Sequence, residues 1–122
     1  MALKTYRRIR TPLFWALVVG AYVAAILPSR QAPDLGAGDK INHIAAFLAL
    51  TLVGRTAYRQ KPAWRLILGL SLFGVLIELT QAIPLLQRDA SVWDWAADSA
   101  AILVALGIAA LIERQAPALF AP

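Results

Sequence analysis

The residues that could do chemistry in this chain form three short polar groups, and each group lies beside a long apolar stretch. The groups occur in "DKINHIAAF", "ELTQ" and "WDWAAD", and their members are Asp39, Lys40 and His43, then Glu78 and Gln81, then Asp94 and Asp98. A histidine near several carboxylates can carry out general acid–base chemistry or hold a hard divalent cation. Lys40 and Arg88 add positive charge that can bind a phosphate or a carboxylate.

The spacing within each group predicts that its members share one face of a helix. Residues three or four positions apart lie on the same face, which pairs Glu78 with Gln81 and Asp94 with Asp98. Four residues of helix rise about 6 Å, so we expect Asp98 to lie deeper than Asp94. A carboxylate surrounded by hydrocarbon costs several kcal/mol unless it faces a partner or the interior of a bundle. We therefore expect Glu78 and Asp98 to face one shared polar site.

The elements that position these residues are predicted to be membrane-spanning helices. The chain is 60% hydrophobic and 16% charged, with a mean hydropathy of +0.64. Soluble domains are usually about half apolar and a quarter charged. Four apolar runs approach the roughly 20 residues that a helix needs to cross a bilayer. The sequence predicts an all-α integral membrane bundle, a single domain over residues 1–122, with helices near 11–28, 41–58, 64–84 and 94–112.

The first apolar run also has features of a cleaved signal peptide, because a basic segment precedes it. That segment contains Lys4, Arg7, Arg8 and Arg10. The run is long for a signal peptide, and "PSRQA" after it is a poor small-residue cleavage site. We therefore expect the first helix to be retained.

The basic residues predict how the bundle lies in the membrane. Nine of the 12 Lys and Arg residues lie at the N-terminus, around the connection between the second and third helices, and near the C-terminus. The other three are Arg30, Lys40 and Arg88. The positive-inside rule then places both termini in the cytoplasm and the polar groups at the outer face. Because the basic residues flank apolar runs, the pI of about 10.3 does not indicate nucleic-acid binding. The absence of cysteine excludes a disulfide, a thiol nucleophile and a thiolate metal site.

The polar motifs, taken in order, resemble those of VanZ-like membrane proteins. The resemblance rests on "DKINHIAAF", "ELTQ" and "RDASVWDWAAD" and covers about residues 39–107. It implies a small helical protein of the bacterial cytoplasmic (inner) membrane, in a family named after a teicoplanin-resistance protein. The residues that carry over are Asp39, Lys40, His43, Phe47, Glu78, Gln81, Arg88, Asp94 and Asp98. The chain departs from the family at Asp98, where many members have Asn, and in "SAA", where they have a Gly.

Two functions from different classes remain open at this point. In the first, an outward-facing polar pocket recognises or modifies an envelope component: a lipid-linked or cell-wall intermediate, or a glycopeptide-like ligand, with a role in teicoplanin-type antibiotic resistance. His43 and Glu78 are then the candidates for proton transfer or ligand contact. Lys40 and Arg88 would bind an anion, and Gln81 would contact the ligand. Asp39, Asp94 and Asp98 would orient the ligand or bind a cation.

In the second, the chain is a noncatalytic structural or partner subunit, and the polar groups only hold the helices together. A proton path is disfavoured because "AILVALGIAALI" contains no ionisable residue to continue a relay. Catalysis, metal binding, cofactors and oligomeric state stay open.

Overall fold

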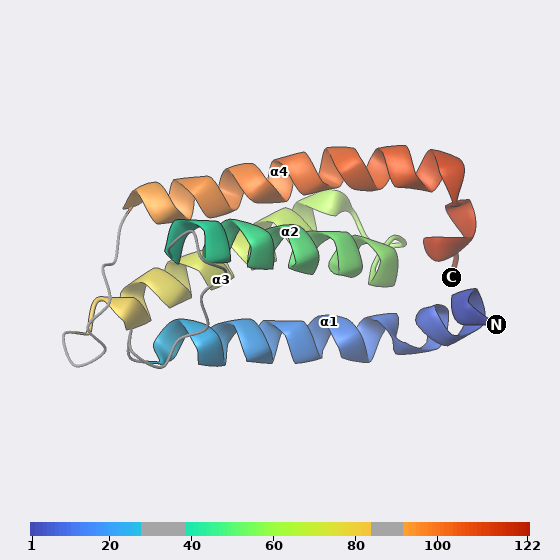
Figure 1. The fold of residues 1–122 in the computed structure, drawn as a ribbon. Coiled ribbons are helices and arrows are strands. Elements are labelled where there is room, and N and C mark those ends of the chain that lie inside the picture. The colour runs from blue at the N-terminus through green and yellow to red at the C-terminus, as the bar shows by residue number, and fades with distance from the viewer. Residues whose placement is uncertain (28–38, 84–91) are drawn as a thin grey trace.

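The protein is a bundle of four α-helices. The computed structural model describes residues 1–27, 39–83 and 92–122, with side chains from Ile41 onward in the second range. The helices are α1 (Ala2–Ile26), α2 (Asp39–Ala57), α3 (Ala63–Gln81) and α4 (Val92–Gln115), followed by the short 3₁₀ helix η2 (Pro117–Leu119). The described residues contain no strand, so the predicted all-α fold is confirmed. Figure 1 shows that helices consecutive in the chain run in opposite directions, which places both termini and the α2–α3 turn at one end.

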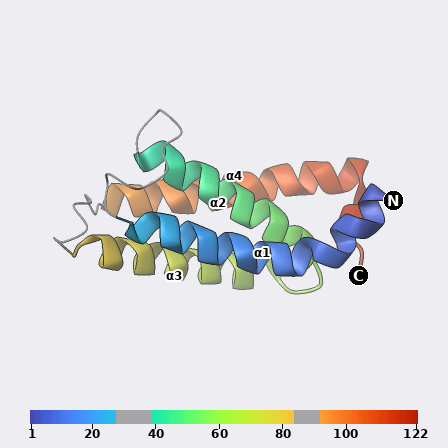
Figure 2. The same cartoon turned by 60° about the horizontal axis from the view of Figure 1, so that its bottom comes forward.

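The predicted start of the first helix near residue 11 is wrong. α1 begins at Ala2, and its basic segment is helical. Lys and Arg are good helix formers. The basic residues therefore mark the end of the apolar run, but α1 continues through them. Pro12 lies inside α1, and Figure 2 shows the first turns bending away from the rest of the helix. A bend is expected there because proline removes one hydrogen bond of the helical ladder. The bounds of the other helices lie within three residues of the prediction.

Three of the helices have the length and composition of membrane spans. These are α1, α3 and α4, whereas the apolar part of α2, Ile41–Ala57, is shorter. Large apolar side chains also face outward, including Trp15, Leu72, Leu79 and Leu103, each more than half exposed. A soluble protein rarely exposes so much contiguous apolar surface. The chain therefore has the build of a multi-pass membrane protein.

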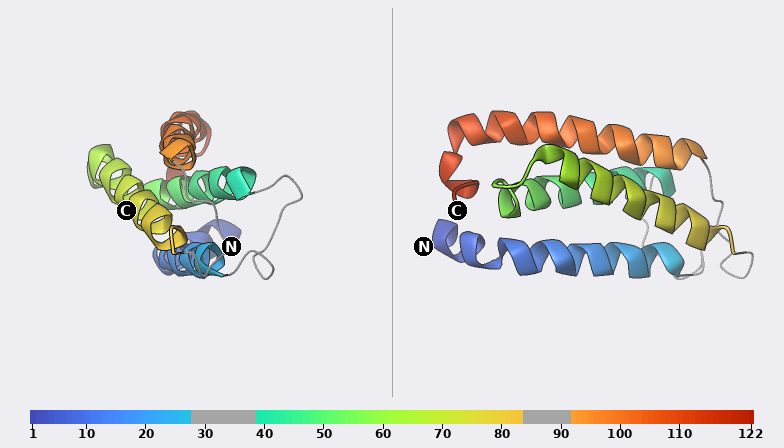
Figure 3. Two further views of the ribbon diagram at one scale, coloured as in Figure 1. Left: turned by 90° about the vertical axis from the view of Figure 1, so that its left-hand side faces the viewer. Right: turned by 180° about the vertical axis from the view of Figure 1, so that it is seen from behind.

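Small residues allow the helices to approach closely. Ala101, Ala105 and Ala109 recur every four residues on α4, and all three are buried. A Cβ added at Gly54 of α2 would lie only 2.7 Å from Cε1 of Phe14 in α1. Close contact through small side chains is typical of helix packing in membranes. The left view of Figure 3 looks along the bundle and shows α2 lying between α1 and α4.

Polar contacts hold the end of the bundle that carries the termini. Arg59 donates two hydrogen bonds to the Glu113 carboxylate, at 2.9 and 3.0 Å. The Arg10 guanidinium donates to the backbone carbonyls of Leu119, at 2.7 Å, and Ala121. These two arginines therefore have partners within the protein and are not simply interfacial charges.

Candidate functional site

Four of the sequence-predicted residues meet inside the bundle, and together they are called the His43 cluster. Its members are His43 from α2, Glu78 and Gln81 from α3, and Asp98 from α4. Nδ1 of His43 lies 3.5 Å from Oδ2 of Asp98 and 3.7 Å from Oε1 of Glu78. The imidazole thus faces two carboxylates from two other helices.

The His43 cluster is enclosed by apolar surroundings. Asp98 is 1% exposed, His43 7% and Gln81 0%, whereas the Glu78 side chain is 12% exposed. The Phe47 ring is buried beside Gly74, which in turn lies against Asp98. Because water is largely excluded, electrostatic interactions within the cluster are stronger than at a surface. Among His43, Glu78 and Asp98, a ligand would reach Glu78 first, because its side chain is the most exposed.

Gln81 sets the hydrogen position on the imidazole of His43. The amide nitrogen of Gln81 donates to the carbonyl of Ala25 in α1 at 3.0 Å and lies 3.5 Å from Nε2 of His43. A backbone carbonyl can only accept, so the nitrogen end of the amide must face Ala25. Nε2 of His43 is then the acceptor of the second amide hydrogen, which assigns the ring hydrogen of neutral His43 to Nδ1. That hydrogen faces the carboxylates of Asp98 and Glu78.

The contact with Ala25 also explains how α1 joins the site. Ala25 lies in the last turn of α1, where carbonyl groups have no donor within their own helix. Gln81 supplies the missing donor. One amide side chain therefore links the end of α1 to the imidazole.

The His43 cluster also has the residue types of a metal site. His43, Glu78 and Asp98 each offer one ligand atom, and these atoms all lie within 4.8 Å of one another. Around a zinc ion with bonds of about 2.1 Å, neighbouring ligand atoms would lie about 3.4 Å apart. The spacing is therefore close to that of a metal site. Binding through Nδ1, however, needs a lone pair on that atom, and Gln81 favours a hydrogen there. The geometry suits an Nδ1–H group that faces two carboxylates better than it suits metal ligation.

We expect divalent cations to leave the stability of the purified protein unchanged. Zn²⁺ or Mn²⁺ would be added to the protein in detergent and thermal unfolding followed, with His43→Gln as the control. If a cation did bind, its presence at a free concentration of 100 times the dissociation constant would raise the free energy of unfolding by about 2.7 kcal/mol. A rise in the unfolding midpoint of the wild type that is absent in His43→Gln would establish a metal site instead.

The remaining predicted residues lie around the His43 cluster or outside the described part of the chain. Asp94 is buried one turn before Asp98 on α4. Asp39 and Lys40 begin α2, but their side chains are outside the described residues, as is all of Arg88. The predicted use of these three in ligand binding stays a prediction.

Sequence reasoning missed Gly74 and Trp95. A Cβ added at Gly74 would lie 3.3 Å from Cδ1 of Trp95 and 3.6 Å from Oδ2 of Asp98. The Trp95 indole also donates to the Ser71 carbonyl at 3.2 Å, which joins α4 to α3. Glycine inside a helix costs up to about 1 kcal/mol relative to alanine and often marks a close approach. The glycine in "LFGVL" was therefore a usable signal.

No protein-family model matches the chain, and no curated protein or solved structure matches it either. The VanZ-like resemblance therefore stays a prediction that rests on the three quoted motifs. Function has to be inferred from the residues of the site.

Proposed function

We propose that the chain is a VanZ-like protein of the bacterial cytoplasmic membrane whose His43 cluster recognises or modifies a component of the cell envelope. The observation that carries the proposal is the position of His43. Its imidazole faces Asp98 and Glu78 at 3.5 and 3.7 Å inside an otherwise apolar bundle. Ionisable groups are costly at such depth, and those found there generally serve a function.

In this proposal all four helices span the membrane. α2 contains 19 residues, and at 1.5 Å per residue it is about 28 Å long, close to the hydrocarbon thickness of a bilayer. It packs against α1 and α4, so it exposes less of its surface to lipid than an outer helix does. α2 can therefore cross the membrane with a shorter apolar part.

Both termini lie in the cytoplasm in this proposal. The basic residues near the termini and the α2–α3 turn support this orientation through the positive-inside rule. The His43 cluster lies toward the opposite end, because Gln81 is the last residue of α3 and His43 is in the first turns of α2. Its ligand then comes from the outer side, where cell-wall intermediates and glycopeptides are found.

The members of the His43 cluster have different roles in this proposal. Glu78 is the most exposed of the three ionisable groups and exchanges a proton with the ligand. Neutral His43 directs its Nδ1 hydrogen toward the carboxylates of Glu78 and Asp98, which stabilises the negative charge that Glu78 carries after it releases its proton. Asp98 holds that hydrogen on this side of the ring. Gln81 orients the imidazole ring. The ligand is a lipid-linked or cell-wall intermediate or a glycopeptide of the teicoplanin type.

The test uses two probes on the purified protein in detergent: teicoplanin and a lipid-linked cell-wall intermediate. We expect one of them to bind the wild type, measured by native mass spectrometry, and to bind Glu78→Gln at least tenfold more weakly. Expression in a susceptible host should raise the minimum inhibitory concentration of teicoplanin if the glycopeptide is the relevant ligand. Absence of binding by both probes, together with unchanged susceptibility, would overturn the proposal.

A second function is supported by the burial of the His43 cluster. Asp98 and Gln81 are almost fully enclosed, and the cluster touches all four helices, since the Gln81 amide reaches Ala25 of α1. A noncatalytic membrane subunit could use such a cluster only to hold its helices together. Loss of stability without loss of a specific binding activity would favour this function.

A further inference from the structure

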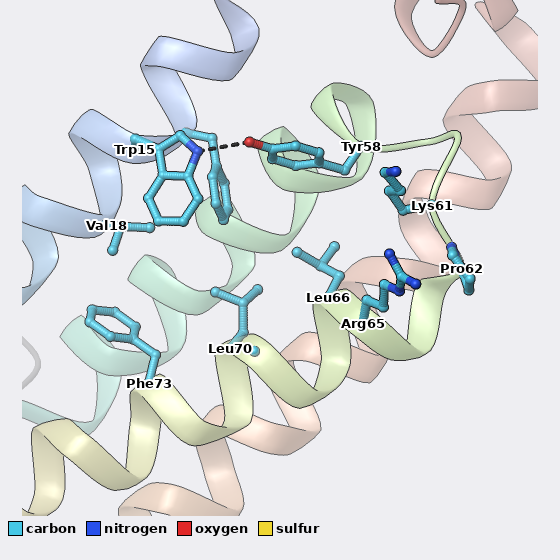
Figure 4. A pocket seen from close by; sticks show the side chains of 11 residues that line it. Trp15, Val18, Tyr58, Lys61, Pro62, Arg65, Leu66, Leu70 and Phe73 are labelled. Carbon is cyan, nitrogen blue, oxygen red and sulfur yellow. Dashed lines mark hydrogen bonds between the residues drawn. The ribbon is translucent and has the colours of Figure 1, made fainter.

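A cavity lies between α1 and α3 at the other end of the bundle, near the α2–α3 turn. Its volume is about 430 Å³, which is within the usual range of about 300–1,000 Å³ for small-molecule sites. Figure 4 shows its lining, with Trp15 and Tyr58 joined by a hydrogen bond of 2.8 Å along one side. The cavity is separate from the His43 cluster and shares no residue with it.

The cavity has an apolar body and a cationic mouth. Phe14, Leu70 and Phe73 supply aromatic and aliphatic surface. Lys61 and Arg65 lie beside the start of α3, and Figure 4 shows their charged ends near one another, with Phe73 at the far end. Arg65 and Phe73 are eight residues apart on α3, so the apolar surface extends about 12 Å from the mouth.

Lys61 and Arg65 differ from Arg59 and Arg10, two other basic residues at this end of the bundle. Arg59 binds Glu113, and Arg10 binds backbone carbonyls near the C-terminus. Within the part of the chain that the structure describes, the Lys61 ammonium has no ion-pair partner, and the Arg65 guanidinium only stacks on the Trp64 ring, at 5.7 Å from its centroid. Both charges are therefore available to an external anion.

We propose that this cavity binds one anionic phospholipid. Its phosphate contacts Lys61 and Arg65, and an acyl chain lies along Phe14, Leu70 and Phe73. Charge complementarity selects an anionic headgroup, since two cations at one mouth attract phosphate and repel a cationic ligand. The apolar body selects a lipid over free phosphate, because an acyl chain makes van der Waals contact with the lining that phosphate alone would leave unfilled. The site is independent of the proposed function of the His43 cluster.

The test compares binding of phosphatidylglycerol, phosphatidylcholine and inorganic phosphate to the full chain in detergent, measured by native mass spectrometry. We expect the wild type to retain one phosphatidylglycerol and to bind it at least tenfold more tightly than phosphatidylcholine. The double variant Lys61→Gln/Arg65→Gln should lose that preference. Arg114→Gln is the matched control, because Arg114 is an exposed cation near the same end that does not line the cavity.

A second variant fills the cavity without removing charge. A Cβ at Gly69 meets nothing within 4 Å although Gly69 lines the cavity, so Gly69→Phe should displace the acyl chain at little steric cost. Gly107→Phe is its control, since Gly107 on α4 is equally open but lies outside the cavity. We expect Gly69→Phe to weaken phosphatidylglycerol binding at least tenfold and Gly107→Phe to leave it unchanged.

Three outcomes would overturn the proposal. Equal affinity of the wild type for both lipids would exclude recognition of the anionic headgroup. If inorganic phosphate, added at the same concentration as phosphatidylglycerol, displaced the lipid completely, the site would bind the anion alone and would not use the acyl chain. Equal binding by Gly69→Phe and Gly107→Phe would place the lipid elsewhere. Thermal unfolding of each variant identifies misfolding, and Gly69→Leu replaces Gly69→Phe if the latter does not fold.

Discussion

Replacing His43 by leucine is expected to lower the free energy of unfolding by about 3 kcal/mol, the upper end of the range for a buried acceptor left without its donor, because two carboxylates lose the same group. The substitution keeps an apolar side chain of moderate size but removes the group that both carboxylates face. Glu78 and Asp98 are then left with carboxylate oxygens within 4.8 Å of each other in a largely water-free site. Thermal or denaturant unfolding in detergent measures the loss.

Thr51→Val provides the control for this prediction. Thr51 is a fully buried residue of the same helix, two turns from His43, and its hydroxyl donates only to the Phe47 carbonyl of α2. Its loss is expected to cost about 1 kcal/mol. The triple variant His43→Leu/Glu78→Gln/Asp98→Asn should recover part of the stability, because it removes the repelling charges together with the imidazole. Equal stability of His43→Leu and the wild type would show that the imidazole does not compensate the carboxylates.

The meeting of three helices at His43 could be predicted because it depends on features that the sequence states directly. Spacings of three and four put Glu78 with Gln81 and Asp94 with Asp98 on common faces. Alternating helix directions then bring the end of α3 and the starts of α2 and α4 to one end of the bundle. The high cost of an isolated carboxylate in an apolar bundle supplied the reason for these faces to meet.

The contacts of single atoms could not be predicted in the same way. Gln81 donates to the backbone carbonyl of Ala25. That carbonyl lacks a donor because it lies in the last turn of α1, and residue types alone do not show where α1 ends. The start of α1 at Ala2 could not be predicted from the apolar pattern, because charged residues such as Lys and Arg continue a helix as readily as apolar ones. The cavity between α1 and α3 depends on how these two helices pack against each other, and residue spacing along the chain does not determine that packing.

If the His43 cluster acts as proposed, replacing Glu78 by glutamine is expected to abolish its activity while preserving the fold. Glutamine keeps the size and one acceptor oxygen of the side chain but cannot exchange a proton, and general acid–base catalysis typically contributes about 10²–10⁴-fold to a rate. We therefore expect a loss of at least a hundredfold in turnover of the envelope substrate, with the free energy of unfolding changed by about 1 kcal/mol or less. If the protein binds its ligand without chemistry, the same variant should lose about tenfold in affinity.

Glu113→Gln is the matched control, since it makes the same chemical change in the Arg59–Glu113 pair at the opposite end of the bundle. That pair is partly exposed, and exposed ion pairs contribute only about 0–1 kcal/mol, so this variant should keep both activity and stability. The pair of variants separates the two proposed functions. If the His43 cluster is a functional site, Glu78→Gln should lose activity while its free energy of unfolding stays unchanged. If the cluster is purely structural, Glu78→Gln should lose stability, and any loss of activity should match the fraction of unfolded protein.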